Sequence, residues 1–210
     1  MNGMDSVWNW GLSEFRDNVA ADRPTPGGGA AAMVSASVGM GLVLMALRIT
    51  ARKDGDGSRF LPLVESGERL MIELGAHADA DIAAFDSYLV ALRMPKETEE
   101  EKAARRRAMD EAAKAATEIP LNAAQSCLEG LDLALQAVPA ASTHIVSDVA
   151  AGAIMMHGAL SAALLNVDIN LKSVRDESAR ADYAASRARL QQKGDERHAR
   201  ITAAFAARMG

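Results

Sequence analysis

Apolar residues recur along most of this chain at intervals of three and four, the spacing that places them on one face of an α-helix. The first set predicts a helix over residues 5–21 and consists of Trp8, Leu12, Phe15 and Val19. A longer set predicts a helix over 60–93 and consists of Leu63, Leu70, Leu74, Phe85, Tyr88 and Leu92. No segment alternates convincingly between apolar and polar residues, as a half-buried strand does. The pattern therefore predicts an all-α fold.

Glycine, proline and capping residues set the limits of the other predicted helices. One helix is expected to begin in the glycines at 27–29 and to end near residue 52, before the turn sequence KDGDGS. Thr98 and Glu101 have the spacing of a capping box, which predicts the start of another helix. Pro120 is expected to begin or kink a further stretch that ends near 137. Two more helices are expected, at about 146–174 and 179–208.

These elements predict one domain over residues 1–210, an up-and-down bundle of about six long helices. The large amount of apolar helix surface for a bundle of this size also suggests self-association. The chain has 23 basic and 28 acidic residues and a formal net charge of −5, so nucleic acid is not expected as a partner.

Two further features predict where the protein is found. Its one cysteine, Cys127, excludes an intramolecular disulfide and fits a reducing compartment. The uncharged stretch 27–47 is long enough to suggest a membrane span, but its many Gly, Ala and Ser residues and its missing aromatic belts favour a buried helix. We therefore expect a soluble, cytoplasmic protein with no membrane partner.

The sequence PTPGGGAAAM at 24–33 is the first candidate site. Residues 27–32 have the spacing of a dinucleotide-binding loop, but that motif follows a strand, and the preceding residues predict a helix. A Walker-type phosphate loop needs Lys and then Ser or Thr after the glycines, where this chain has alanines. Two interpretations stay open: backbone N–H groups that approach a ligand closely, or a tight helix start between packed helices.

An acidic residue occupies the apolar face of the predicted 60–93 helix. On a helical wheel Asp81 lies within about 40° of the apolar residues, whereas Asp79 and Asp86 point to the polar side. Burial at this position raises the pKa of a carboxyl group, which suits a general base or acid near neutral pH. The alternative is a structural carboxylate paired with a neighbouring helix, or with His77 one turn earlier.

A second polar set shares one face of the predicted 146–174 helix, with Asp148 at one end and Asn166 and Asn170 at the other. Asp148 and Asn166 are about 27 Å apart along a helix axis, so they cannot both reach one small ligand atom. Three interpretations stay open: contact with different parts of an elongated ligand, a site completed by a second subunit, or polar packing at the helix ends.

The remaining reactive side chains are not spaced as a known site. The four histidines lie far apart in the sequence and show no metal-binding spacing: His77, His144, His157 and His198. Cys127 has no evident base partner and is expected in the core. No metal site is therefore expected.

Four segments together resemble the formiminotetrahydrofolate cyclodeaminase / methenyltetrahydrofolate cyclohydrolase family: PTPGGGAAAM, DADIAAFDSYLVALRMPKETEEEKAAR, SDVAAGA and NVDINL. The resemblance covers about residues 12–178, with the motifs in the family's order and at similar spacing. It implies an all-helical homodimer that acts on folate-bound one-carbon units, without a metal or redox cofactor, at a site near the subunit interface.

The resemblance also implies roles for individual residues. Asp81 matches the position proposed as proton acceptor in the family. The residues that match substrate-binding positions are Pro26, Gly27, Gly28, Gly29, Asp148, Asn166 and Asn170. Two segments depart from the family pattern. PAASTHIVSD replaces an Asn-containing turn, and Ala51-Arg52-Lys53 replaces Gly-Lys-Lys, although Lys53 is still expected to meet a folate carboxylate.

The family has two activities, and the resemblance alone does not choose between them. We expect methenyltetrahydrofolate cyclohydrolase activity, because the sequence carries no formiminotransferase segment of the kind that often accompanies a cyclodeaminase. The alternatives are formiminotetrahydrofolate cyclodeaminase activity, or a helical scaffold that binds folate without turnover.

Overall fold

The computed structural model describes residues 6–210, and this part of the chain contains helices and no strand. Its α-helices are α1 (Leu12–Val19), α2 (Gly28–Lys53), α3 (Leu61–Leu92), α4 (Glu99–Ala140), α5 (Val146–Asn170) and α6 (Glu177–Met209). Three short 3-10 helices are η1 (Val7–Asn9), η2 (Gly57–Phe60) and η3 (Leu171–Ser173). The prediction of an all-α fold is confirmed.

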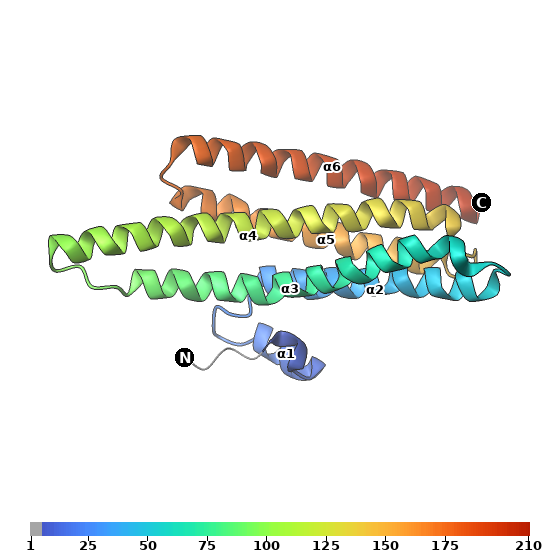
Figure 1. Ribbon diagram of the computed structural model, residues 1–210, viewed down its shortest axis with the longest axis horizontal. Helices are drawn as coiled ribbons and strands as arrows, with labels where there is room; N and C mark the ends of the chain where they lie inside the picture. The colour runs from blue at the N-terminus through green and yellow to red at the C-terminus, as the bar shows by residue number, and fades with distance from the viewer. Residues whose placement is uncertain (1–5) are drawn as a thin grey trace.

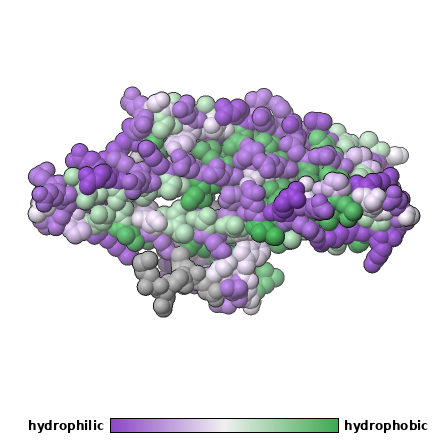
Figure 2. Space-filling view, in the orientation of Figure 1, coloured by the Kyte–Doolittle hydropathy of each residue, from purple (hydrophilic) through white to green (hydrophobic). Residues whose placement is uncertain are grey.

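The five long helices lie side by side along one axis and are joined at alternating ends, while α1 lies against one side (Figure 1). α2 packs against α3 and α5, and α4 packs against α3, α5 and α6. The core between them contains Met40, Leu44, Leu74, Leu131 and Leu160, all fully buried. Hydrophilic residues cover α6 and the α3–α4 tip, whereas hydrophobic residues reach the surface over the middle of the bundle (Figure 2).

Small residues bring α2 and α5 into close contact. A Cβ atom placed on Gly39 of α2 would lie 2.8 Å from the carbonyl oxygen of Gly152 on α5. By length and composition alone, α2 and the segment 146–173 could each span a membrane. In the bundle, 61% of the most apolar stretch of α2 is buried, as expected for a core helix, against 44% for 146–173.

The N-terminal segment differs from the predicted helix over 5–21, of which residue 5 lies outside the described residues. It forms the short η1 and then α1, with Trp10 and Gly11 in extended conformation between them. Leu12, expected on the buried face, is 83% exposed. The apolar spacing identified helical residues here but not a single continuous helix.

Pro120 does not begin a separate helix, because α4 is one helix of 42 residues that passes through it. Proline has no N–H, so the carbonyl of Ala116, four residues earlier, lacks its helical donor. The side-chain Nδ2 of Asn170, at the end of α5, donates to that carbonyl over 2.6 Å. A side chain from another helix thus supplies the bond that the proline removes.

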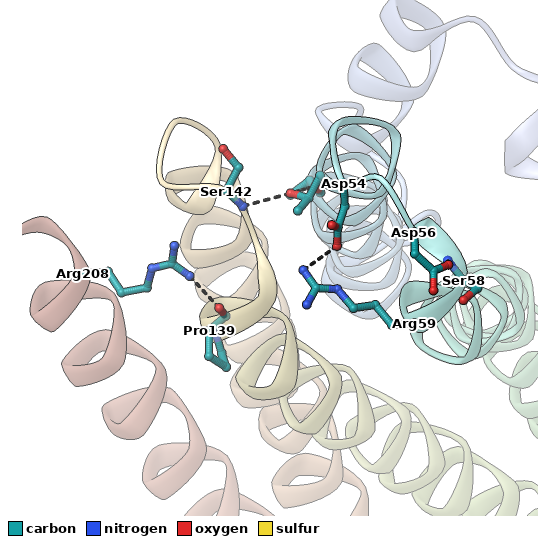
Figure 3. Close-up of polar contacts among 9 residues, drawn as sticks. Asp54, Asp56, Ser58, Arg59, Pro139, Ser142 and Arg208 are labelled. Atoms are coloured by element: carbon teal, nitrogen blue, oxygen red, sulfur yellow. Dashed lines mark hydrogen bonds and ion pairs between the residues drawn. The ribbon is translucent and has the colours of Figure 1, made fainter.

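The end of the bundle where α2 finishes is closed by contacts between loops and helix ends (Figure 3). The N–H of Ser142 donates to Oγ1 of Thr50 over 2.9 Å. Arg208 donates to the carbonyl oxygens of Val138 and Pro139 over 2.6 and 2.8 Å. These contacts join the ends of α2, α4 and α6 beside the first turn of α5.

Candidate functional site

The start of α2 is the point at which the predicted site residues meet. Gly27 precedes the helix and has no side chain to cap it, so the first N–H groups of α2 need acceptors from elsewhere. Asp81, in the middle of α3, supplies one, because its Oδ2 accepts the N–H of Ala30 over 3.0 Å. A carboxylate at a helix N-terminus is also favoured by the helix dipole.

Gly29, in the first turn of α2, lies close to polar side chains from two other helices. A Cβ atom placed on Gly29 would lie 2.7 Å from Nδ2 of Asn166, and closer still to the Asp81 carboxylate. Gly29 is buried, and Asp81 and Asn166 are half-buried. The absence of a side chain at position 29 therefore lets α2, α3 and α5 bring a carboxylate and an amide to one place.

The surroundings of Asp81 raise the pKa of its carboxyl group, as the sequence predicted. Loss of solvent raises the pKa of the Asp81 carboxyl above its ordinary value, and the hydrogen bond from Ala30 opposes this shift in part. A half-buried carboxylate with a raised pKa is a stronger base than an exposed one. It is suited to accept a proton from a bound water molecule.

The predicted pairing of Asp81 with His77 was wrong, whereas its pairing with a neighbouring helix is confirmed by the bond to Ala30 of α2. The Nε2 of His77 lies 3.0 Å from Oγ of Ser126 on α4, and Ser126 donates to Glu73 over 2.6 Å. Burial lowers the pKa of His77. The contacts among His77, Ser126 and Glu73 link α3 to α4, and the Asp81 carboxylate bonds to the start of α2 instead.

Two predicted site residues lie at the other end of the bundle. Lys53 ends α2 and is exposed, about 36 Å from Gly29 along the helix axis. Asp148 is in the first turn of α5, about 27 Å from Asn166. In one chain, therefore, neither residue reaches the group formed by Gly29, Asp81 and Asn166.

The remaining predicted residues differ in their surroundings. Pro26 is buried, Gly27 is partly exposed and Gly28 is exposed, so the turn has one open side. The Thr25–Pro26 peptide bond is cis. Asn170 is half-buried, and its amide nitrogen is bound to the carbonyl of Ala116, which leaves the amide oxygen as its group for other contacts.

A cavity of about 480 Å³ adjoins this turn and was not predicted from the sequence. Trp10, Arg23, Pro26, Asp79 and Ile82 are among its lining residues. The sequence placed Asp79 on the polar side of α3, but its location beneath the N-terminal segment depends on a contact between distant residues. Of the lining residues, Pro26 was predicted as a substrate-binding position, and Ile82, which follows Asp81 in the sequence, was not.

Other reactive side chains form a separate group between α5 and α6. The rings of His157 and His198 stack at 4.4 Å, although they are distant in the sequence, and His157 lies 2.8 Å from Asp195. Among the described residues, no group of three or more His, Cys, Asp or Glu side chains is placed to hold a metal ion. Cys127 is buried, as predicted, and burial raises the pKa of its thiol to about 12.

Known proteins are similar to this chain in sequence and in fold. The formiminotransferase-cyclodeaminase family matches residues 11–189. The methenyltetrahydrofolate cyclohydrolase of Methylorubrum extorquens is 35% identical over 173 residues, which are 80% of this chain and 82% of the relative. The formimidoyltransferase-cyclodeaminase of Gallus gallus is 30% identical over 198 residues, which are 91% of this chain.

The chain spans 36% of the Gallus gallus protein, about a third of its length. In three dimensions, formiminotetrahydrofolate cyclodeaminase from Thermotoga maritima superimposes with a TM-score of 0.85 at 24% identity, over 97% of this chain and 100% of that one. This likeness shows that the two chains have the same fold.

Proposed function

The chain belongs to the formiminotransferase-cyclodeaminase family, and we propose that it is a methenyltetrahydrofolate cyclohydrolase, which converts 5,10-methenyltetrahydrofolate to 10-formyltetrahydrofolate. The observation that carries this proposal is the half-buried Asp81 carboxylate, held at the glycine start of α2 beside Asn166. The relative from Methylorubrum extorquens, matched over four-fifths of both chains, favours the cyclohydrolase among the family's activities.

In the proposed reaction, Asp81 acts as the general base. Water attacks the methenyl carbon between N5 and N10, and Asp81 takes one proton as the carbon–oxygen bond forms. The hydroxyl of the resulting adduct then loses its proton while the bond from carbon to N5 breaks and N5 gains a proton. Protonated Asp81 can supply that proton, so the net products are 10-formyltetrahydrofolate and one proton. Water and a proton acceptor suffice, and we propose no cofactor.

The glycine turn and Asn166 are proposed to position the substrate. Pro26 and the glycines at 27–29 form one wall, and a flat ring can approach the backbone closely at Gly28, where nothing lies within 4 Å of a Cβ position, whereas Gly29 contributes by giving room to Asp81 and Asn166. The Asn166 amide, close to Gly29, can both donate and accept hydrogen bonds to substrate heteroatoms. The structural alternative is that Asp81 only caps α2, and the variant Asp81→Asn separates the two roles because an amide oxygen can still accept from Ala30.

We propose that the active form is a homodimer with the site near the subunit interface. Lys53 and Asp148 lie too far from Asp81 to share its substrate contacts within one chain. In an antiparallel dimer that packs through α2 and α5, the end of one subunit that carries Lys53 and Asp148 would lie beside the end of the other subunit that carries Asp81. Exposed apolar side chains on these two helices are suited to such an interface: Val38, Met45, Ile154, Leu165 and Ile169. We also propose that this enzyme works in the cytoplasm as a single domain.

A second candidate function is favoured by the relatives named as cyclodeaminases. In that reaction N10 attacks a formimino group on N5 and ammonia leaves. The purified protein should be given 5,10-methenyl- and 5-formimino-tetrahydrofolate side by side, with absorbance and ammonia release as the readouts. Faster loss of the methenyl absorbance supports the cyclohydrolase, whereas ammonia release alone supports the cyclodeaminase. Binding of folate without either reaction supports a scaffold.

A further inference from the structure

The face of α3 that carries Asp81 continues toward the end of the helix with two aromatic residues, Phe85 and Tyr88. On a helical wheel they lie within about 40° of Asp81, and they follow it by about 6 and 10.5 Å along the helix axis. A ligand whose reacting atom lies at Asp81 therefore covers both rings if it extends by one or two helical turns. The cavity under the N-terminal segment lies on the other side of α3, with Asp79 and Ala83 in its lining.

The burial of this face of α3 changes at Asp81. Leu74, two turns before Asp81 on the same face, is fully buried. Phe85 and Tyr88 are half-buried, and Leu92, one turn beyond Tyr88, is 44% exposed. The reason is that α2 begins beside Asp81 and runs back along the first half of α3, so the second half of α3 extends past it (Figure 1). The two rings thus lie on the bundle-facing side of α3, at a level where α2 no longer covers it.

The two rings are not part of the packing that holds α3 in place. In the part of the chain that the structure describes, neither ring belongs to the main hydrophobic core or packs against it. Ala84 and Ala91 are buried in the second half of α3, which packs against α4. Arg105 of α4 also donates to the carbonyl of Leu92, at the last turn of α3, over 3.2 Å. The helix that carries the rings is therefore fixed by other contacts, and part of each ring is open to a ligand.

We propose that the p-aminobenzoyl ring of the folate substrate lies on Phe85 and Tyr88. In 5,10-methenyltetrahydrofolate the reacting carbon joins N5 to N10, and N10 carries this ring, so the ring lies directly beside the atoms that react at Asp81. Its faces are apolar and suit aromatic side chains, which attract other rings in offset or edge-to-face arrangements. This inference rests on the proposed function for the identity of the ligand.

Two features favour the p-aminobenzoyl ring over the pteridine on these side chains. The pteridine has a polar edge, and the hydrogen-bonding groups near Asp81 are those of the glycine turn and Asn166. Phe85 and Tyr88 offer a mainly apolar surface instead. In addition, the exposure of this face increases toward Leu92, which leaves the charged glutamate beyond the ring in water.

The test compares two ligands by calorimetry: tetrahydrofolate, and 6-methyltetrahydropterin, which keeps the reduced pteridine and lacks the p-aminobenzoylglutamate part. We expect Phe85→Leu and Tyr88→Leu each to weaken binding of tetrahydrofolate roughly two- to tenfold, as loss of an aromatic pair does, and to leave 6-methyltetrahydropterin unchanged. Tyr88→Phe keeps the ring and should bind as the wild type does. The matched control is Val90→Ala, on the opposite face of α3 and 66% exposed, which should change the binding of neither ligand.

Three results overturn the proposal: no loss of tetrahydrofolate binding in either leucine variant, an equal loss for both ligands, or a loss in Tyr88→Phe as large as in Tyr88→Leu. Light scattering of the same variants gives their mass. Half the wild-type mass in the leucine variants, with unchanged affinity for tetrahydrofolate, would assign the two rings to a subunit interface instead.

Turnover is measured separately on 5,10-methenyltetrahydrofolate, where Phe85→Leu should raise KM and Val90→Ala should not. Tetrahydrofolate binding that depends on the two rings, without turnover by the wild-type protein, contradicts only the proposed cyclohydrolase. Failure of the wild-type protein to bind tetrahydrofolate contradicts both proposals.

Discussion

The carboxylate of Asp81 accepts the backbone N–H of Ala30 over 3.0 Å, and so caps a helix that begins more than fifty residues earlier in the chain. This bond fixes the orientation of one oxygen, while the other lies toward Gly29 and Asn166. Burial of the carboxylate costs stability, and the bond from Ala30 offsets only part of that cost, because the pKa of Asp81 remains raised. The contact between Asp81 and Ala30 thus caps α2 and also orients the carboxylate that we propose as the general base.

Replacement of Asp81 by Asn should stabilise the protein near neutral pH. A raised carboxyl pKa means that the native state binds the proton more tightly than the unfolded state. Stability therefore falls as pH rises from the ordinary Asp range through the folded pKa, and the full cost persists above it. The amide carries no charge and avoids this cost. Urea unfolding at several pH values should show a stabilisation at pH 7 that shrinks as the pH is lowered through the raised folded pKa toward about pH 4, and that no longer changes below it.

A stabilisation by Asp81→Asn that does not vary with pH would show that the burial of this charge is not its cause. Asp79→Asn provides a comparison on the same helix, because Asp79 accepts two hydrogen bonds from the N-terminal segment. That variant is expected to lower the free energy of unfolding, by weakening the docking of this segment.

Replacement of Gly29 by Ala should lower both stability and activity. The new methyl group would collide with the Asp81 carboxylate and the Asn166 amide, at a cost of about 1–3 kcal/mol in unfolding free energy. Gly28→Ala is the control for stability, because nothing lies within 4 Å of a Cβ there. That variant should be unchanged or more stable by about 0.4–1 kcal/mol. Equal unfolding midpoints for the two variants would contradict the packing described for Gly29.

Replacement of Asn170 by Ala should destabilise the protein by about 1–3 kcal/mol, because the carbonyl of Ala116 loses its donor. In a Pro120→Ala background the backbone N–H at 120 returns, so the same substitution should cost less. A double-mutant cycle measured by urea unfolding should give a coupling of at least about 0.5 kcal/mol. Additive effects of the two substitutions would rule out the compensation of Pro120 by Asn170.

Replacement of Ile154 by Glu should dissociate the proposed dimer without unfolding the chain, since this side chain is 59% exposed in the monomer. Light scattering after size exclusion should show half the wild-type mass, and activity should fall with it. Met209→Glu, at an equally exposed position on α6, should leave the mass unchanged. A monomeric wild-type protein with full activity would contradict the proposed site at the interface.

The apolar periodicity of the sequence predicted the helices well because it reports which faces are buried. Of the two alternatives for Pro120, a new helix was wrong, since the donor that replaces the missing N–H is Asn170, fifty residues away and not detectable by local rules. The periodicity also failed at residues 5–21, where the contacts of Trp8 and Ser6 with α3 compete with a continuous helix.

In the candidate site, too, the features that depend on the local sequence could be predicted, and those that depend on contacts between distant segments could not. Asp81 could be identified because an acidic residue in an apolar face breaks the pattern, and its raised pKa follows from that burial. Its contact with Ala30, and the position of Asn166 at Gly29, depend on how three helices pack. Arg23 and Trp10 carried no such signal, because the cavity that they line is formed by distant segments.

The most direct test of the proposed function is the decay of 5,10-methenyltetrahydrofolate absorbance with wild-type protein and with Asp81→Asn, compared with buffer. Wild-type protein should accelerate the decay, and Asp81→Asn should fold normally yet lose roughly 10²–10⁴-fold of that acceleration, the usual contribution of a general base. A wild-type rate equal to buffer would contradict the cyclohydrolase. An unchanged rate in Asp81→Asn would contradict Asp81 as its base.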